Sequence, residues 1–233
     1  MSEPKNDRYI RQSGIVDQDN LAKENVLVVG VGAVGRPVCH MLAATGVPNV
    51  TLIDLDTIEE HNCTTQTWRE DDCGKYKAEV AAGEMLAINS KIDVKFFNER
   101  WRPKLFKGKD VADFYKERPF TSFFNCVDSL SMRKKLFDYY SKTVNAMFDA
   151  RIGGQQLQMV SVFDDESKKK YPSTIVDDKE AYEEQGCHGV PMIAFSAVAA
   201  AAFLVQQFVA NVQGMPMYFN RGLVFPSSEL YEM

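Results

Sequence analysis

The sequence predicts an α/β fold in which a doubly wound, mainly parallel sheet carries an antiparallel extension and a long crossover loop. Short β-branched runs alternate with segments of helical periodicity, which is typical of a parallel sheet covered by helices. A glycine-rich turn follows the first of these runs. The expected strands are residues 25–29, 49–53, 93–97, 121–125, 144–149 and 157–163, and the expected helices are 36–44, 77–88 and 131–140.

Composition excludes several classes of protein. The chain has 233 residues, which suits one large domain, and 45% of them are hydrophobic, enough to bury a core. A net charge of −5 and a pI near 5.3 argue against a nucleic-acid binder, which usually has a basic face. Five cysteines without framework spacing favour a reducing compartment, and the polar N-terminus lacks the apolar core of a signal peptide. We therefore expect a cytoplasmic protein.

Two segments depart from the alternating pattern. Residues 190–205 contain no charge, but two glutamines interrupt the apolar run before it reaches the about 20 residues of a membrane span. We interpret it as a helix buried in the core or in a subunit interface, with no membrane contact. Residues 164–186 contain 12 charged side chains, so we expect a solvated surface loop there.

The glycine-rich turn predicts a nucleotide site. Gly30, Gly32 and Gly35 form a GxGxxG pattern between a buried strand and a helix, typical of a Rossmann-like fold. Such a turn lets the backbone approach a phosphate, and the helix N-terminus supplies free N–H donors. Asp54 closes the second strand, where its carboxylate could accept from ribose hydroxyls. These residues alone do not distinguish a site for NAD from a site for ATP.

Further motifs in a fixed order favour ATP. Asp7–Gln12 stands before the first strand, and Asp54–Asn62 with Gln66 follows the second. Gly74–Lys77 precedes a helix, and Cys126–Ser129 follows the fourth strand. Together they resemble the ThiF/MoeB/HesA superfamily, whose members activate ubiquitin-like and sulfur-carrier proteins. The resemblance is closest from Arg8 to about Arg133.

This resemblance implies a reaction: ATP condenses with the C-terminal carboxylate of a small carrier protein, giving an acyl-adenylate and pyrophosphate. The enzyme mainly positions the reactants and stabilises charge. The resemblance also implies a single adenylation domain over residues 1–233. Its expected parts are an N-terminal arm and helix (1–24), a nucleotide-binding sheet (25–163), a charged crossover loop (164–189), and an apolar interface helix with C-terminal strands (190–233).

The resemblance assigns roles to individual residues. Lys77 would neutralise phosphate charge, and Asp128 would hold Mg²⁺ near the α-phosphate. Arg11 matches an arginine finger that reaches the phosphates from the other subunit of a homodimer. The expected cofactor-binding residues are Gly30, Gly32, Gly35, Asp54, Asp56, Asn62, Gln66 and Lys77.

Each residue also has a plainer interpretation. A lysine that opens a helix, like Lys77, is usually solvated, and an aspartate after a strand, like Asp128, is often an N-cap. Arg11 could be an ordinary surface charge.

The sequence departs from the family pattern at Thr65, where many relatives carry an arginine. Arg36 and Arg133 are the candidates to supply the missing cation. The chain also has no CxxC pair, so we predict no structural zinc.

Cys187 is the cysteine with a candidate chemical role. It stands just before the apolar helix, and a thiol at a helix N-terminus can have a lowered pKa. Some relatives carry a thioester-forming cysteine on the corresponding loop, so thioester transfer to Cys187 is a second, separable hypothesis. The alternative is a structural or merely exposed cysteine.

The expected cofactors are ATP and Mg²⁺, and the expected partners are a carrier protein, a second copy of the chain and, as a further candidate, a conjugating enzyme. Two rival functions stay open. Thr65 motivates a degenerate protein that binds nucleotide or carrier as a scaffold. The glycine turn also suits an NAD-dependent oxidoreductase, although that function gives no reason for Lys77 or for the segment around Arg11.

Overall fold

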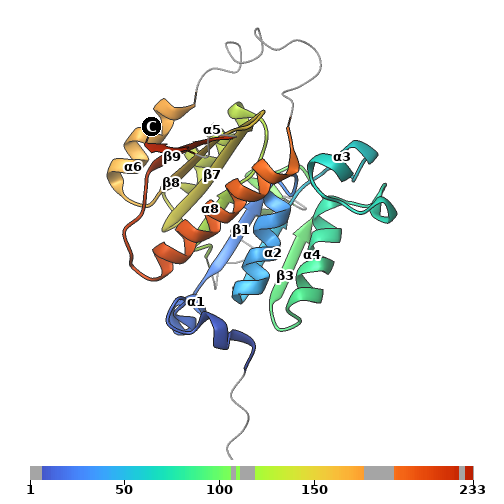
Figure 1. Cartoon of the computed structure of the whole chain (residues 1–233), viewed down its shortest axis with the longest axis horizontal. Helices are drawn as coiled ribbons and strands as arrows, with labels where there is room; N and C mark the ends of the chain where they lie inside the picture. The colour runs from blue at the N-terminus through green and yellow to red at the C-terminus, as the bar shows by residue number, and fades with distance from the viewer. Residues whose placement is uncertain (1–6, 106–108, 111–118, 176–191, 226–228, 233) are drawn as a thin grey trace, which may run out of the picture.

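The computed structural model describes residues 7–105, 109–110, 119–175, 192–225 and 229–232 (Figure 1). These residues form an eight-stranded sheet in the order β10-β9-β8-β7-β6-β1-β2-β3, and a two-stranded ribbon of β4 and β5. The strands are β1 (Asn25–Val29), β2 (Asn49–Ile53), β3 (Asp93–Phe97), β4 (Lys104–Leu105), β5 (Lys109–Asp110), β6 (Ser122–Asn125), β7 (Ala146–Gly153), β8 (Gln156–Val162), β9 (Asn220–Val224) and β10 (Glu229–Glu232).

The expected fold class is confirmed. Strands β3, β2, β1, β6 and β7 run parallel, whereas β8, β9 and β10 extend the sheet antiparallel. The helices are η1 (Asp7–Gln12), α1 (Gln18–Leu21), α2 (Gly35–Thr45), α3 (Glu60–Thr65), η2 (Glu70–Asp72), α4 (Lys77–Ile88), α5 (Leu130–Tyr140), α6 (Asp165–Lys170), η4 (Tyr171–Thr174) and α8 (Ala194–Val212).

The two faces of the sheet bury separate cores. Side chains alternate along a strand, so Val26 and Val28 of β1 enter one core while Leu27 and Val29 enter the other. The first core lies under α2, α4 and α8, which cover the near face of the sheet in Figure 1. The second packs against α5 on the opposite face. With both faces covered, β1 is buried along its whole length, as its unbroken apolar run predicts.

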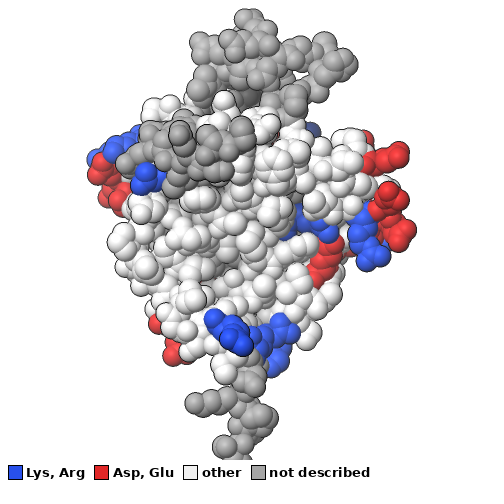
Figure 2. Space-filling view, viewed as in Figure 1, with Lys and Arg blue, Asp and Glu red and all other residues white. Residues whose placement is uncertain are grey.

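By length and composition, helix α8 is long and apolar enough to cross a membrane, but 56% of its apolar 18-residue stretch is buried inside the protein. It packs on β7, β8 and α2, which confirms that the uncharged run forms a core helix. Figure 2 shows few charged side chains over α8 and α2. Phe195 and Val198 of α8 are exposed.

The expectation of a solvated loop from residue 164 onward is wrong for its first part. Asp164 caps α6 by accepting from the backbone N–H of Ser167 at 2.7 Å. Acidic residues open this short helix and lysines close it, which suits the helix dipole. Helix η4 follows, and its Tyr171 is fully buried against Phe137. The many charged residues around Tyr171 hid its role as a buried aromatic residue in the sequence pattern. The rest of the expected loop, residues 176–191, lies outside the described residues.

The order of the strands sets the place for a ligand. The chain runs from β1 outward to β2 and β3, and then returns to β6 on the other side of β1. Ligands of open α/β sheets bind beyond the carboxyl ends of the strands at such a reversal. Here those ends lead into the glycine turn after β1, Asp54 after β2 and Asp128 after β6.

Candidate nucleotide-binding site

The glycine turn after β1 is shaped by steric demands at two of its three glycines. Gly30 has φ +87°, and a Cβ there would lie 2.5 Å from the carbonyl oxygen of Cys126. A Cβ at Gly35 would lie 1.9 Å from the carbonyl oxygen of Gly30. At Gly32 the nearest atom would be Oε1 of Gln66 at 3.5 Å, an ordinary contact. Gly30 and Gly35 therefore shape the turn, whereas Gly32 leaves its surface open toward Gln66.

Asp54 joins the end of β2 to this turn. Its Oδ2 accepts from the backbone N–H of Val31 at 2.6 Å, and its Oδ1 accepts from that of Asp56 at 2.8 Å. Burial raises the pKa of Asp54, although both hydrogen bonds oppose the shift. The carboxylate predicted to bind a ribose is thus also the group that positions the turn.

A polar pocket of about 560 Å³ lies beside the turn. Five predicted site residues line it: Asp56, Asn62, Gln66, Lys77 and Asp128. The remaining lining residues are Leu55, Thr57, Glu59, His61 and Tyr76. The structure therefore brings together residues from three separate motifs of the sequence.

Lys77 opens α4 and is only 6% exposed. Its Nζ lies 3.4 Å from Oδ2 of Asp56. The interpretation of Lys77 as a solvated helix-opening lysine is therefore wrong. It is also the single lysine or arginine among the described lining residues, which include the carboxylates of Asp56, Glu59 and Asp128.

Asn62 and Gln66 form the wall contributed by α3. The Oδ1 of Asn62 accepts from the backbone N–H of Glu59 at 3.0 Å, so Asn62 is part of a capping box that fixes the start of the helix. Gln66 Oε1 accepts from the indole N–H of Trp68 at 3.0 Å. Both amides are held by the fold and face the pocket from defined positions.

Asp128 stands exposed after β6, and its Oδ1 accepts from the backbone N–H of Ser129 at 2.8 Å. The N-cap of α5 is Ser129, whose hydroxyl accepts from Met132 N–H. The alternative that Asp128 serves as the helix N-cap is therefore wrong. Its carboxylate lines the pocket.

Arg36 fixes the segment that carries Gln66. Its guanidinium donates to both carboxylate oxygens of Glu84, to the carbonyl and hydroxyl oxygens of Thr67, and stacks 4.5 Å from the Trp68 ring centre. Thr67 has φ 60°, a left-handed conformation unusual for a β-branched residue. The contacts from Arg36 offset this strain next to the pocket.

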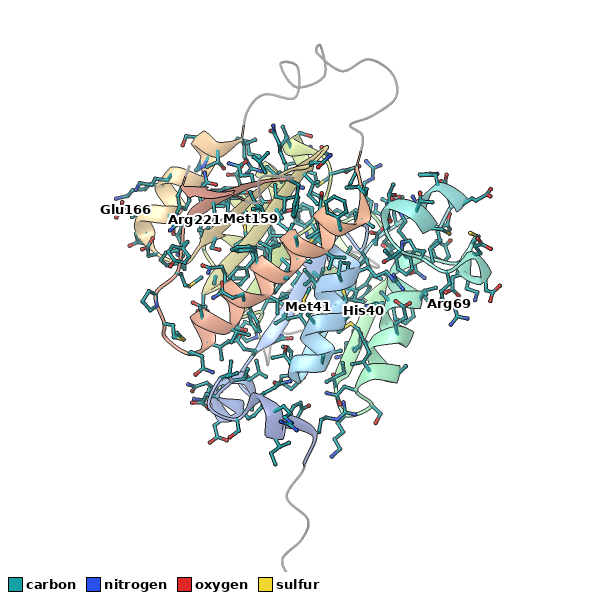
Figure 3. The ribbon with its side chains drawn as sticks, viewed as in Figure 1. His40, Met41, Arg69, Met159, Glu166 and Arg221 are labelled. Carbon is teal, nitrogen blue, oxygen red and sulfur yellow. The ribbon has the colours of Figure 1, made fainter. Side chains whose placement is uncertain are left out.

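Glu84 also pairs with His40, whose Nε2 lies 2.8 Å from Oε2 of the carboxylate. Figure 3 labels His40 on α2. Burial opposes ionisation of Glu84, but the hydrogen bonds from His40 and Arg36 outweigh it and lower the pKa of Glu84 to about 2.

Neither arginine considered as a substitute at position 65 lines the pocket. Arg36 is engaged as above. Arg133 is buried and donates to Asp149 and to the carbonyl oxygen of Asn125. Asp149 also accepts from Arg151 and from the hydroxyl of Tyr171, so this buried cluster holds η4 against β7. The expectation of compensation by Arg36 or Arg133 is therefore wrong.

Arg11 is not brought to the pocket of its own chain. Arg11 is exposed on η1, whose neighbours Arg8 and Gln12 donate to the carbonyl oxygens of Ile88 and Ala44, at the C-terminal ends of α4 and α2. That is the end of both helices away from the glycine turn. Cys187 lies outside the described residues.

Two other cysteines pack in or against the core. Cys39 is buried in α2, and burial raises the pKa of its thiol well above the usual value. Cys126 follows β6, and burial raises its pKa to about 12. The expectation that both are small core residues is confirmed.

Sequence reasoning did not single out Glu59, His61 or Tyr76 as lining residues. Glu59 and His61 lie within the motif after β2, so their proximity to Asn62 is the signal that could have identified them. Tyr76 directly precedes Lys77 and pairs with Thr57 in an isolated antiparallel β-bridge. That long-range pairing leaves no mark in the sequence.

A model of the ThiF family matches residues 6–229, nearly the whole chain. This chain belongs to the ThiF family. The match includes the glycine turn, the residues lining the pocket, and strands β8 and β9 of the antiparallel extension. Family membership therefore rests on the whole domain and not on the glycine turn alone.

Three curated relatives each match less than half of this chain. The adenylyltransferase and sulfurtransferase MOCS3 of Mus musculus is 36% identical over 115 residues, covering 45% of this chain and 25% of the relative. The probable adenylyltransferase/sulfurtransferase MoeZ of Mycobacterium tuberculosis is 35% identical, covering 42% of this chain and 26% of the relative. The sulfur carrier protein adenylyltransferase of Thermus thermophilus is 35% identical, covering 40% and 37%. The matches thus span about a quarter to a third of these longer proteins.

Solved structures share the fold. E. coli MccB superposes with a TM-score of 0.78 at 21% identity, covering 99% of this chain and 70% of that one. PaaA superposes with a TM-score of 0.72 at 19% identity, covering 100% and 74%. MccB has been crystallised with ATP and with AMPCPP and MccA.

Proposed function

We propose that this protein is an adenylyltransferase that uses ATP and Mg²⁺ to activate the C-terminal carboxylate of a ubiquitin-like or sulfur-carrier protein. One observation carries the proposal: the polar pocket beside the glycine turn joins Lys77 and Asp128 at the carboxyl ends of the parallel strands. The matched relatives named adenylyltransferases support it.

The reaction requires positioning more than chemical activation. A carboxylate oxygen of the carrier attacks the α-phosphorus, the bond from that phosphorus to the bridging oxygen breaks, and pyrophosphate leaves with the electron pair. The N–H groups of the glycine turn and α2 would bind phosphate oxygens. Lys77 would offset the charge that develops on the α-phosphate and on the leaving group.

The pocket fits a magnesium nucleotide better than a free one. Its lining carries three carboxylates and one lysine, so an unaccompanied triphosphate would meet repulsion. Mg²⁺ is commonly held by one or two carboxylates together with substrate phosphates. The carboxylate of Asp128 is a ligand of this kind. A bound Mg²⁺ would supply the positive charge that the lining lacks.

Arg11 would complete the site from a second copy of the chain. It lies away from the pocket of its own chain. Phe195 and Val198 of α8 are exposed, and few charged side chains lie over α8 in Figure 2. Such a face suits burial between two copies. We propose that the homodimer acts in the cytoplasm. Thioester transfer to Cys187 and transfer to a conjugating enzyme would be later steps.

A nucleotide-binding scaffold is the second candidate function. The observation that favours it is the single cation among the described lining residues, with Thr65 where relatives carry an arginine. A scaffold would bind MgATP but release no pyrophosphate.

Titration calorimetry with MgATP tests the site. Lys77→Met should weaken binding at least tenfold because it removes the lining cation, whereas the control Lys75→Met should leave it unchanged. Lys75 is an exposed neighbour paired with Asp72. Equal affinity of both variants would contradict the proposed site.

A further inference from the structure

Two cysteines face each other beside the pocket wall. Cys63 lies on α3, and Cys73 directly follows η2. Their Sγ atoms are 3.8 Å apart. We propose that Cys63 and Cys73 are a modification site at which a peroxide forms a reversible intramolecular disulfide. The bond would hold α3 against the segment that leads to Lys77.

The positions suit closure of this bond. A disulfide needs its sulfurs about 2.05 Å apart, so they must approach by roughly 2 Å. Both segments are short surface elements, with Cys73 exposed and Cys63 half-buried, so this approach moves no long helix or strand of the core. The buried Cys39 offers no comparable access.

The chemistry balances with hydrogen peroxide as oxidant. The exposed Cys73 loses its proton and attacks the peroxide as a thiolate. The O–O bond breaks, Cys73 becomes a sulfenic acid, and the leaving hydroxide takes up the proton as the first water. The Cys63 sulfur then attacks the Cys73 sulfur, loses its proton and displaces water. Together two thiols and one peroxide give one disulfide and two waters. Burial and a hydrogen bond with Cys73 raise the pKa of Cys63, so Cys63 is not the thiol that reacts first with the peroxide.

The bond would act on both walls of the pocket. Asn62 and Gln66 flank Cys63 in sequence, and the turn after Cys73 leads through Gly74 to Tyr76 and Lys77. Drawing these walls together would shift lining side chains on both. We therefore expect weaker nucleotide binding in the oxidised protein, and this consequence rests on the proposed function.

Peptide mapping tests the site without reference to activity. The full chain is treated with hydrogen peroxide, alkylated, digested and analysed by mass spectrometry. We expect a loss of 2 Da in a linked Cys63–Cys73 peptide, reversed by dithiothreitol. Cys63→Ser and Cys73→Ser should each abolish that peptide, and Cys187→Ser should retain it. A different pairing, or no linked peptide, would overturn the proposal.

Calorimetry with MgATP on the same samples tests the consequence. Oxidised wild-type protein should bind several-fold more weakly than reduced protein, and Cys63→Ser should show no difference. Unchanged affinity in protein shown to be linked would overturn the effect on binding. Failure of the reduced protein to bind MgATP would instead contradict the proposed function, while the mapped disulfide would stand.

Discussion

Asp54 Oδ2 accepts a hydrogen bond from the backbone N–H of Val31 at 2.6 Å, which ties the end of β2 to the glycine turn after β1. The same carboxylate accepts from Asp56 N–H, at the start of the lining segment. One side chain therefore sets the relative position of the phosphate-binding turn and the pocket wall.

Asp54→Ala should lower both stability and nucleotide affinity. It leaves two backbone N–H groups without their acceptor, and losing a hydrogen bond to a charged group typically costs about 1.5–3 kcal/mol. Thermal unfolding and MgATP calorimetry measure the two effects. The neighbouring Asp56→Ala, whose carboxylate makes the longer contact with Lys77, should cost less stability; equal destabilisation would contradict this role for Asp54.

Gly35→Ala and Gly32→Ala should separate folding from binding. At Gly35 the new methyl group would overlap the carbonyl oxygen of Gly30, so destabilisation should reach or exceed the upper end of the about 1–3 kcal/mol usual for overpacking. At Gly32 the methyl group has room, so the variant should fold normally but bind MgATP more weakly because the backbone can no longer approach a phosphate as closely. Similar melting temperatures for the two variants would refute this distinction.

Glu84 should make the protein acid-sensitive in a defined range. Because its pKa falls from 4.5 in the unfolded chain to about 2 in the fold, the stabilisation is complete above about pH 4.5 and is lost as the pH falls toward 2. Glu84→Gln should flatten this part of the curve of unfolding free energy against pH. The control Glu79→Gln, exposed on the same helix, should leave it steep. An unchanged slope in Glu84→Gln would show that Arg36 and His40 do not act through Glu84.

Most of the fold could be predicted from the sequence, since the strand ranges depend on local periodicity and turn residues. Strand β2 begins and ends as expected, and so does α4. The helix after residue 164 was missed because a run of charge conceals Tyr171, whose burial depends on distant Phe137.

The site was predicted to a similar extent. Motif residues such as Asp56, Lys77 and Asp128 meet in one pocket because the carboxyl ends of parallel strands share an edge. The position of Arg36 could not be foreseen, because its partners Glu84 and Thr67 come from other elements. The hydrogen bond from Val31 N–H to Asp54 likewise could not be foreseen, because it joins two strand ends that are 23 residues apart in the sequence.

Thr65→Arg should raise the affinity for MgATP. The residue is half-buried next to Gln66, at the end of the α3 wall, and a second cation near three lining carboxylates favours a polyphosphate. We expect an increase of several-fold by calorimetry, reduced at high salt because the gain is electrostatic. Thr64→Arg, exposed one residue earlier, is the matched control, and an equal gain there would mean that the position has no special role.

Carrier-dependent exchange of labelled pyrophosphate into ATP tests the central claim most directly. With MgATP and small carrier proteins that end in Gly-Gly, we predict exchange by the wild-type chain that requires an intact carrier C-terminus. Asp128→Asn, which keeps the acceptor for Ser129 N–H, should fold normally and lose the exchange. Undiminished exchange by Asp128→Asn, or binding of MgATP without exchange for every carrier, would contradict adenylation at this pocket.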